Sequence, residues 1–202
     1  MEIRALQACW GTELLEAVAL AALLRLFVAA LTRVRGTSMQ PTLPDGAWLL
    51  VAVWPARLRR VRRGDVVICR YPGRGRQLFV KRAVGLPGDA VWRTDGVTYV
   101  NGAPLEAGFR RFLPDYPPYT LGRDEYFCVG DNRRRSHDSR DWRRKGSRIV
   151  GPVDGRLLSG VVRCVIWPPR AMGRVSRQFS PEAPGQMREI RSVCEMGDDG
   201  RT

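Results

Sequence analysis

Residues 36–43 read Gly-Thr-Ser-Met-Gln-Pro-Thr-Leu, and the rest of the chain can be organised around this octapeptide. It directly follows an apolar N-terminal segment, and Ser38 is the first serine of the chain. A serine hydroxyl is a weak nucleophile until an adjacent base removes its proton. If Ser38 is catalytic, the chain must therefore supply that base from a distant position.

The lysine content indicates which residue the base could be. Only Lys81 and Lys145 are lysines among the 34 basic residues, and all the others are arginines. A guanidinium cannot lose its proton in a protein, whereas an ammonium can. Lys145 belongs to a basic run, but Lys81 lies in residues 78–84, a stretch typical of a β-strand. Burial there would lower the pKa of Lys81 and make it a general base; a strand lysine that extends into solvent is the alternative.

The single histidine, His137, would have to serve in any Ser-His-Asp arrangement. Asp138 is its neighbour in the chain, but adjacent side chains on an extended segment point to opposite faces. We therefore favour a solvent-facing loop position for His137 over a place in a catalytic triad.

Composition limits the other function classes. The 202 residues allow one domain with appendages, and the net charge of +14 suits nucleic acid, an anionic lipid surface or plain solubility. The five cysteines are far apart and form no C-x-x-C pair, which argues against structural zinc and a disulfide-dense scaffold. We expect no metal and no cofactor.

Residues 14–34 are apolar and contain neither Gly nor Pro, so we expect one membrane-spanning anchor helix after a short tail, residues 1–13. Glu16 and Arg25 interrupt the run, and a central arginine costs about 3 kcal/mol on insertion scales. A cleavable secretory signal and an amphipathic surface helix are the alternatives. Arg33 and Arg35 favour a cytoplasmic C-terminal side, but only weakly, because long domains are translocated largely regardless of charge.

The segment 35–170 combines short apolar runs with frequent turn signals, which predicts a mostly β domain of short antiparallel strands. Residues 105–122 are rich in Pro and aromatics and predict an insertion or long loop, and residues 171–202 predict a polar, mobile tail. The expected strands are residues 47–54, 66–69, 78–84, 91–93, 97–100, 126–129 and one or more within 149–167.

Three blocks of this sequence resemble the conserved boxes of type I signal peptidases. The octapeptide resembles their S-M-x-P-T-L box, and residues 81–89, KRAVGLPGD, resemble K-R-x-x-G-L-P-G-D. Residues 130–140, GDNRRRSHDSR, are similar to G-D-N-x-x-x-S-x-D-S-R. Their order and the preceding apolar segment also agree, so the resemblance covers residues 14–167 and implies a signal-peptidase-like β domain behind one N-terminal transmembrane helix.

The resemblance implies roles for five residues. Ser38 would be the nucleophile, and Lys81 the general base that later protonates the leaving amine, a known variant of the triad. Ser136 would orient the Lys81 amine. Asp138 and Arg140 would form an ion pair that holds this segment, which is also what an ordinary loop salt bridge would do.

The same resemblance implies how the site is lined. Phe79 and Cys128 would shield Lys81 from water, although simple core filling would place them equally well. Some members have a serine hydroxyl two residues before the nucleophile, where this chain has Gly36. We therefore expect an oxyanion hole that depends on the Ser38 backbone N–H. The shallow pockets for small substrate side chains would be lined by Val34, Met39, Phe79 and Val80.

The implied substrates are exported preproteins with small residues before the cleavage site. The implied location is the plasma membrane of a bacterium, with a single-pass anchor and the catalytic domain on the outer face. The arginine runs, with Trp48 or Trp54, would seat the domain on anionic lipid, and no nucleic acid is expected as a partner.

Two alternatives remain at this point. A self-cleaving Ser-Lys repressor would need an N-terminal set of DNA-binding helices, and this chain offers one apolar helix instead. A membrane-tethered basic module that binds nucleic acid would use the net charge, but no aromatic-basic stacking pattern or helix-turn-helix signal is evident.

Overall fold

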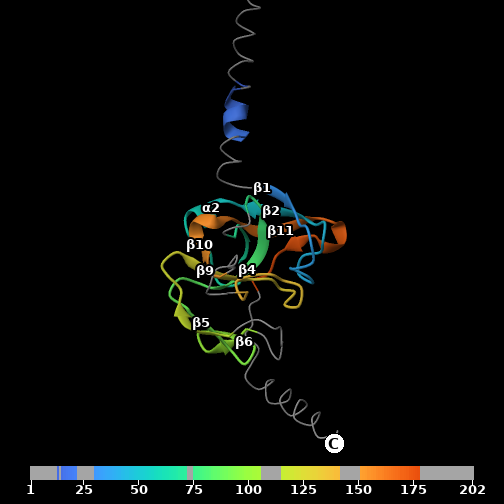
Figure 1. The fold of residues 1–202 in the computed structure, drawn as a ribbon. Coiled ribbons are helices and arrows are strands. Elements are labelled where there is room, and N and C mark those ends of the chain that lie inside the picture. The colour runs from blue at the N-terminus through green and yellow to red at the C-terminus, as the bar shows by residue number, and fades with distance from the viewer. Residues whose placement is uncertain are drawn as a thin grey trace, which may run out of the picture.

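The computed structural model describes residues 13, 15–21, 30–71, 75–105, 115–141 and 151–177, whose strands form two antiparallel sheets (Figure 1). The larger sheet has eight strands in the order β1-β2-β11-β3-β4-β9-β10, with β12 paired to β11. Its strands are β1 (Ala30–Arg33), β2 (Trp48–Ala52), β3 (Val66–Cys69), β4 (Phe79–Gly85), β9 (Glu125–Val129), β10 (Val153–Asp154), β11 (Leu158–Trp167) and β12 (Gly173–Arg174). The prediction of a mostly β domain with antiparallel strands is confirmed.

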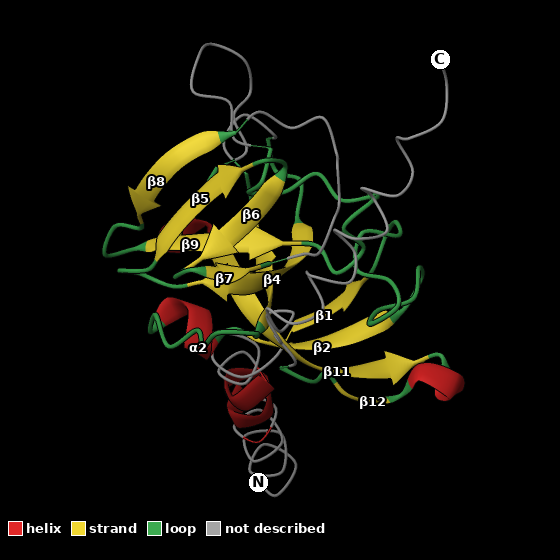
Figure 2. Cartoon of the chain, turned by 90° about the horizontal axis from the view of Figure 1, so that it is seen from below, coloured by secondary structure: helices red, strands yellow, loops and turns green. Residues whose placement is uncertain are grey.

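The smaller sheet has four strands in the order β7-β6-β5-β8. They are β5 (Ala90–Thr94), β6 (Val97–Val100), β7 (Ala103–Pro104) and β8 (Tyr116–Thr120). The predicted hairpin is β5-β6, paired from Val91 with Val100 to Thr94 with Val97. Figure 2 shows this sheet at one end of the domain and strands β1, β2, β11 and β12 at the other.

The octapeptide is fixed to the larger sheet by its own apolar residues. Met39 and Leu43 are 1% and 0% exposed and pack in one cluster with Leu49 of β2 and Val66 of β3. Burying a side chain of this size contributes about 2–3 kcal/mol. Strand β3, with all four residues buried, lies between β11 and β4 at the centre of the sheet, so the serine segment rests against its most rigid part.

The predicted helix over residues 14–34 is wrong at its C-terminal end. Residues 15–21 are helical, but Ala30–Arg33 forms β1 and pairs with β2 from Ala30 opposite Val51 to Arg33 opposite Trp48. This pairing satisfies the backbone through β2, which a sequence pattern of helix formers does not reveal. Residues 14 and 22–29 lie outside the described residues. Among the helices the structure does describe, none is long and apolar enough to cross a bilayer.

Two further expectations need correction. The 105–122 segment contains a strand, β8, which pairs with β5, whereas residues 106–114 lie outside the described residues. The predicted strand 47–54 ends at Ala52, because Trp54 and Pro55 begin the short helix α2 (Trp54–Arg57), where proline suits the first turn.

The mobile tail predicted from residue 171 begins too early. The 3₁₀ turns η1 (Gly155–Leu157) and η2 (Pro169–Ala171) flank β11, and after η2 the chain returns along that strand as β12. The Val175 N–H donates to the Arg163 carbonyl at 3.1 Å, and Arg177 Nε lies 2.6 Å from Asp65 Oδ1. Residues 171–177 therefore belong to the β domain, and residues 178–202 lie outside the described residues.

Candidate active site

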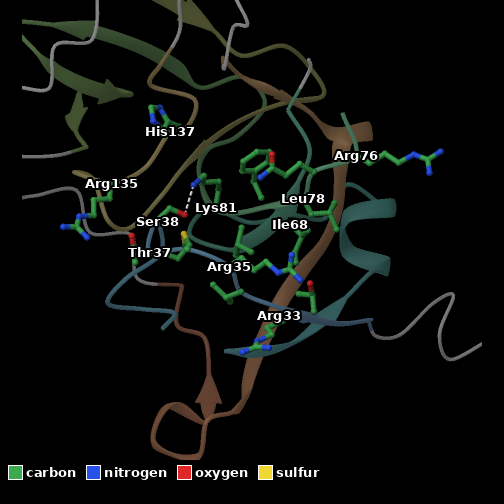
Figure 3. A pocket seen from close by; sticks show the side chains of 17 residues that line it. Arg33, Arg35, Thr37, Ser38, Ile68, Arg76, Leu78, Lys81, Arg135 and His137 are labelled. Atoms are coloured by element: carbon green, nitrogen blue, oxygen red, sulfur yellow. Dashed lines mark hydrogen bonds between the residues drawn. The ribbon is translucent and has the colours of Figure 1, made fainter. Parts of the chain in front are cut away.

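Strand β4 brings Lys81 to the octapeptide. Lys81 pairs with Val67 of β3 and is only 2% exposed. Its Nζ lies 2.9 Å from Ser38 Oγ and 3.0 Å from Ser136 Oγ. Figure 3 shows the Ser38 and Lys81 side chains pointing toward each other at the wall of a pocket. The three residues, from three distant parts of the chain, thus meet at one amine.

The loop after β9 holds the serine segment from the other side. The Asn132 backbone N–H donates to the Ser38 carbonyl at 3.0 Å, and Asn132 Nδ2 donates to the Thr37 carbonyl at 3.1 Å. Upstream of the serine, the Gly36 N–H donates to Asp45 Oδ1 at 2.8 Å. The backbone around Ser38 is therefore fixed by three hydrogen bonds from side chains and loops of the same domain.

Gly130 occupies the point where these segments come closest. A Cβ added there would lie 2.5 Å from the Ser38 carbonyl oxygen and would collide with Ser136 Oγ. Any side chain at this position would push the Ser38 and Ser136 segments apart. The requirement for glycine here comes from this close approach of two backbones.

Beneath Ser136 lies a buried ion pair. Arg140 Nε and Nη2 bond the two carboxylate oxygens of Asp138 at 2.8 Å and 3.0 Å, and the Gly130 N–H donates to Asp138 Oδ2 at 3.0 Å. Burial by itself would raise the pKa of Asp138, but the Arg140 charge and the bonds from Arg140, Ser136 and Gly130 hold it at about 2. Asp138 is thus a fixed anion that receives the Ser136 hydroxyl, as the resemblance implied for an ion pair in this segment.

The charge state of Lys81 is set mainly by burial. Burial lowers the pKa of Lys81, and the Asp138 carboxylate opposes that shift without overcoming it. Within the described part of the chain, no carboxylate lies within ion-pair distance of Nζ. Cys128, which is fully buried, contributes to the dry surroundings of this amine. The neutral form of Lys81 is therefore favoured more than in a lysine exposed to water.

A cleft of about 660 Å³ opens in front of Ser38 and Lys81. All four residues expected to form substrate pockets, Val34, Met39, Phe79 and Val80, line it. The cleft follows the outer edge of β1 and the start of β4, and the described pairing of β4 with β9 begins only at Arg82. Both strand edges therefore offer backbone groups to an extended chain.

His137 also lines the cleft but does not take part in a triad with Ser38. Its Nδ1 lies 3.1 Å from Asp141 Oδ2, and its side chain is 71% exposed. The predicted solvent-facing loop position is confirmed.

Sequence reasoning assigned no role to Gly130, Asp131 or Asn132, although all three belong to the matched G-D-N block. Asp131 accepts two hydrogen bonds from Arg82, at 2.8 Å to Nε and 2.7 Å to Nη2. The signal that could have indicated them was the block itself, whose polar residues and glycine have no helix or strand pattern to explain them.

No group of His, Cys, Asp and Glu that could bind a metal occurs among the residues the structure describes. Cys69, Cys128 and Cys164 carry free thiols.

Comparison with known proteins identifies the family. The family model described as signal peptidase, peptidase S26, matches residues 7–167. A signal peptidase I of Bacillus licheniformis is 34% identical over 171 residues, which cover 79% of this chain and 88% of the relative. A probable signal peptidase I-2 of Synechocystis is 32% identical, covering 86% of this chain and 79% of the relative. A crystal structure of a signal peptidase I from Enterococcus faecalis V583 is 28% identical, with a TM-score of 0.37, covering 50% of this chain and 95% of that one. The chain belongs to the signal peptidase family, peptidase S26.

Proposed function

We propose that this protein is a membrane-bound serine endopeptidase that removes N-terminal signal peptides from exported preproteins, with Ser38 as nucleophile and Lys81 as general base. The observation that carries the proposal is the 2.9 Å separation between Lys81 Nζ and Ser38 Oγ, at a lysine whose pKa is lowered by burial. Membership of the signal peptidase family supports the same reaction.

The hydrogen bonds around Lys81 give the proton transfer a direction. In its neutral form the amine donates one N–H to Ser136 Oγ, whose hydroxyl donates in turn to the Asp138 carboxylate. The nitrogen lone pair is then free to accept the Ser38 proton while Ser38 Oγ attacks the scissile carbonyl carbon. The resulting ammonium returns the proton to the leaving amine, and the acyl-enzyme is then hydrolysed by water activated by the same amine.

The oxyanion of the tetrahedral intermediate would be stabilised by the Ser38 backbone N–H. Within the described part of the chain this N–H donates to no protein acceptor, so it is available to the substrate. Gly36 supplies no side-chain donor, and we infer a hole that depends on backbone groups. Removing a single donor from such a hole costs about 10²–10³ in kcat in a related serine protease.

The substrate would lie extended between the edges of β1 and β4. Main-chain hydrogen bonds to these edges would give affinity, and the apolar floor formed by Val34, Met39, Phe79 and Val80 would admit small side chains. Met39 is 1% and Val34 4% exposed, so these two define the floor rather than a deep pocket. A preprotein with small residues before the scissile bond fits this surface.

The enzyme would be held at the plasma membrane of a bacterium by a single span in the apolar N-terminal segment, with its catalytic domain on the outer face. Contact with anionic lipid would come from Trp48 and Trp54, 41% and 39% exposed, and from Trp167, which pairs with Trp48 across β2 and β11 and is 56% exposed. Two measurements test this: protease access to the domain in intact spheroplasts, and sedimentation with vesicles. Binding that ignores anionic lipid content and salt would contradict the lipid contact.

The activity is tested by incubating the detergent-solubilised full chain with a peptide that spans an Ala-x-Ala site. We expect two products from a single cut after the second alanine, and none from the Ser38→Ala variant. An uncut peptide, or equal cleavage by Ser38→Ala, would refute the proposed function.

A further inference from the structure

Four arginines line the cleft in front of Ser38: Arg33, Arg35, Arg76 and Arg135. None of the described residues that line this cleft is an aspartate or a glutamate. All four arginines are exposed to solvent. The cleft therefore presents a one-sided positive charge to whatever enters it.

These arginines differ from most charged arginines elsewhere in the domain. Arg82, Arg140 and Arg177 are each paired with an aspartate. Among the described residues, by contrast, no acidic group lies within ion-pair distance of the four that line the cleft. Arg33 is steadied only by a hydrogen bond from its Nε to the Gly46 carbonyl at 3.2 Å. Their charges are free for a ligand.

The arginines fall on two sides of the nucleophile. Arg33 and Arg35 follow β1, and Arg76 precedes β4, so these three flank the strand edges that would hold the acyl part of the substrate. Arg135 precedes Ser136 in the loop after β9 and lies on another side of Ser38 in Figure 3. The leaving part of a peptide held between β1 and β4 would have to exit past this loop.

We propose that this cleft selects preproteins that carry acidic side chains close to the scissile bond, with Arg35 as a specificity-determining residue on the acyl side and Arg135 on the leaving side. The proposal rests on the proposed peptidase function and specifies its substrates beyond the small residues of the cleavage motif. Charges that line a cleft concentrate ligands of the opposite sign and reject those of the same sign.

The size of the effect follows from the exposure of these arginines. A solvent-exposed ion pair changes an equilibrium by up to about fivefold, and salt screens it because the Debye length is about 10 Å at 0.1 M and about 3 Å at 1 M. We therefore expect kcat/KM to rise about three- to fivefold for each well-placed aspartate at low salt. This preference should fall below about twofold at 1 M salt.

The test uses the detergent-solubilised full chain and five peptides that share one Ala-x-Ala site. One peptide is neutral, two carry aspartates either before or after the site, and two carry lysines at the same positions. We expect the aspartate peptides to be cleaved faster and the lysine peptides more slowly than the neutral one. Arg135→Gln should remove only the preference after the site, and Arg35→Gln only the preference before it.

Arg134→Gln is the matched control, because it removes the same charge from the same loop at a residue that does not line the cleft. It should keep both preferences. Equal cleavage of all five peptides, or preferences that survive Arg35→Gln and Arg135→Gln, would overturn the inference.

Peptide binding to Ser38→Ala separates this inference from the peptidase assignment. If the wild-type chain cleaves none of the peptides, the proposed function fails, while tighter binding of the aspartate peptides would still support a cleft for acidic chains. Vesicles of phosphatidylcholine with and without phosphatidylglycerol provide the second arm. If Arg35→Gln and Arg135→Gln weaken sedimentation with the anionic vesicles but leave peptide selectivity unchanged, the arginines serve lipid and the inference is wrong.

Discussion

The two faces of strand β4 treat two neighbouring basic residues in opposite ways. Lys81 and Arg82 are 2% and 3% exposed, and successive residues of a strand point to opposite faces. Arg82 makes a two-pronged ion pair with Asp131 and also donates to the Gly64 and Ser176 carbonyls at 2.7 Å and 2.8 Å. Lys81 contacts two serine hydroxyls.

Equal burial therefore has different consequences on the two faces. The buried guanidinium keeps its charge, because a carboxylate and two carbonyls replace its water. The buried ammonium has only hydroxyls in contact, so desolvation lowers the pKa of Lys81. The Arg82 face stabilises the fold, and the Lys81 face would perform the chemistry.

The comparison is tested most severely by changes on the Lys81 face. We expect Ser38→Ala and Lys81→Arg each to lower kcat/KM by about 10⁴-fold or more, because one removes the nucleophile and the other a base that can be deprotonated. Peptide cleavage by purified variants measures this, with circular dichroism to verify folding. Lys145→Arg, the same substitution at the other lysine, should retain activity within about twofold. Substantial cleavage by Lys81→Arg would contradict the assignment.

Gly130→Ala should damage the Lys81 face without changing any of its functional groups. The added methyl group would force the Ser38 and Ser136 segments apart, and a displacement of about 1 Å can cost about 10²-fold in rate. Overpacking should also lower the free energy of unfolding by about 1–3 kcal/mol. Kinetics and urea unfolding report the two effects. In Gly122→Ala the nearest atom is the flexible Glu125 carboxylate at 3.3 Å, so little change is expected; equal behaviour of the two variants would disprove the packing argument.

Changes on the Arg82 face should affect stability first. Arg82→Met leaves Asp131 without its partner, which should lower the free energy of unfolding by about 3 kcal/mol. The folded fraction should still cleave peptide within about tenfold of the wild type. Urea unfolding with parallel kinetics tests this, and the exposed Arg170→Met should stay within about 0.5 kcal/mol. Loss of activity without loss of stability would place Arg82 in the chemistry instead.

The smallest effect is expected from His137→Ala, which alters neither face of β4. His137 is bonded to Asp141 and Ser38 to Lys81, so kcat/KM should stay within about threefold of the wild type. A fall of 10²-fold or more at all pH values would revive the triad that the sequence argued against.

The sequence predicted those parts of the fold and site that depend on local pattern. The apolar runs at 66–69 and 126–129 are strands, and the rarity of lysine singled out Lys81 before any contact was known. β1 was missed because its residues continue a helix-forming pattern and become a strand only by pairing with β2. Gly130 and Asn132 act across about 90 residues of chain, and no local propensity records such an approach.

The protonation state of Lys81 tests the central claim most directly. Because the chain has two lysines, protein made with ¹³C-labelled lysine gives two side-chain signals in an NMR titration, and Lys145→Arg assigns them. We predict that the Lys81 signal titrates at a pKa clearly below the ordinary lysine value of about 10.4, and that kcat/KM rises with pH through the same midpoint. A Lys81 signal that stays in its ammonium form up to the ordinary value would contradict the account.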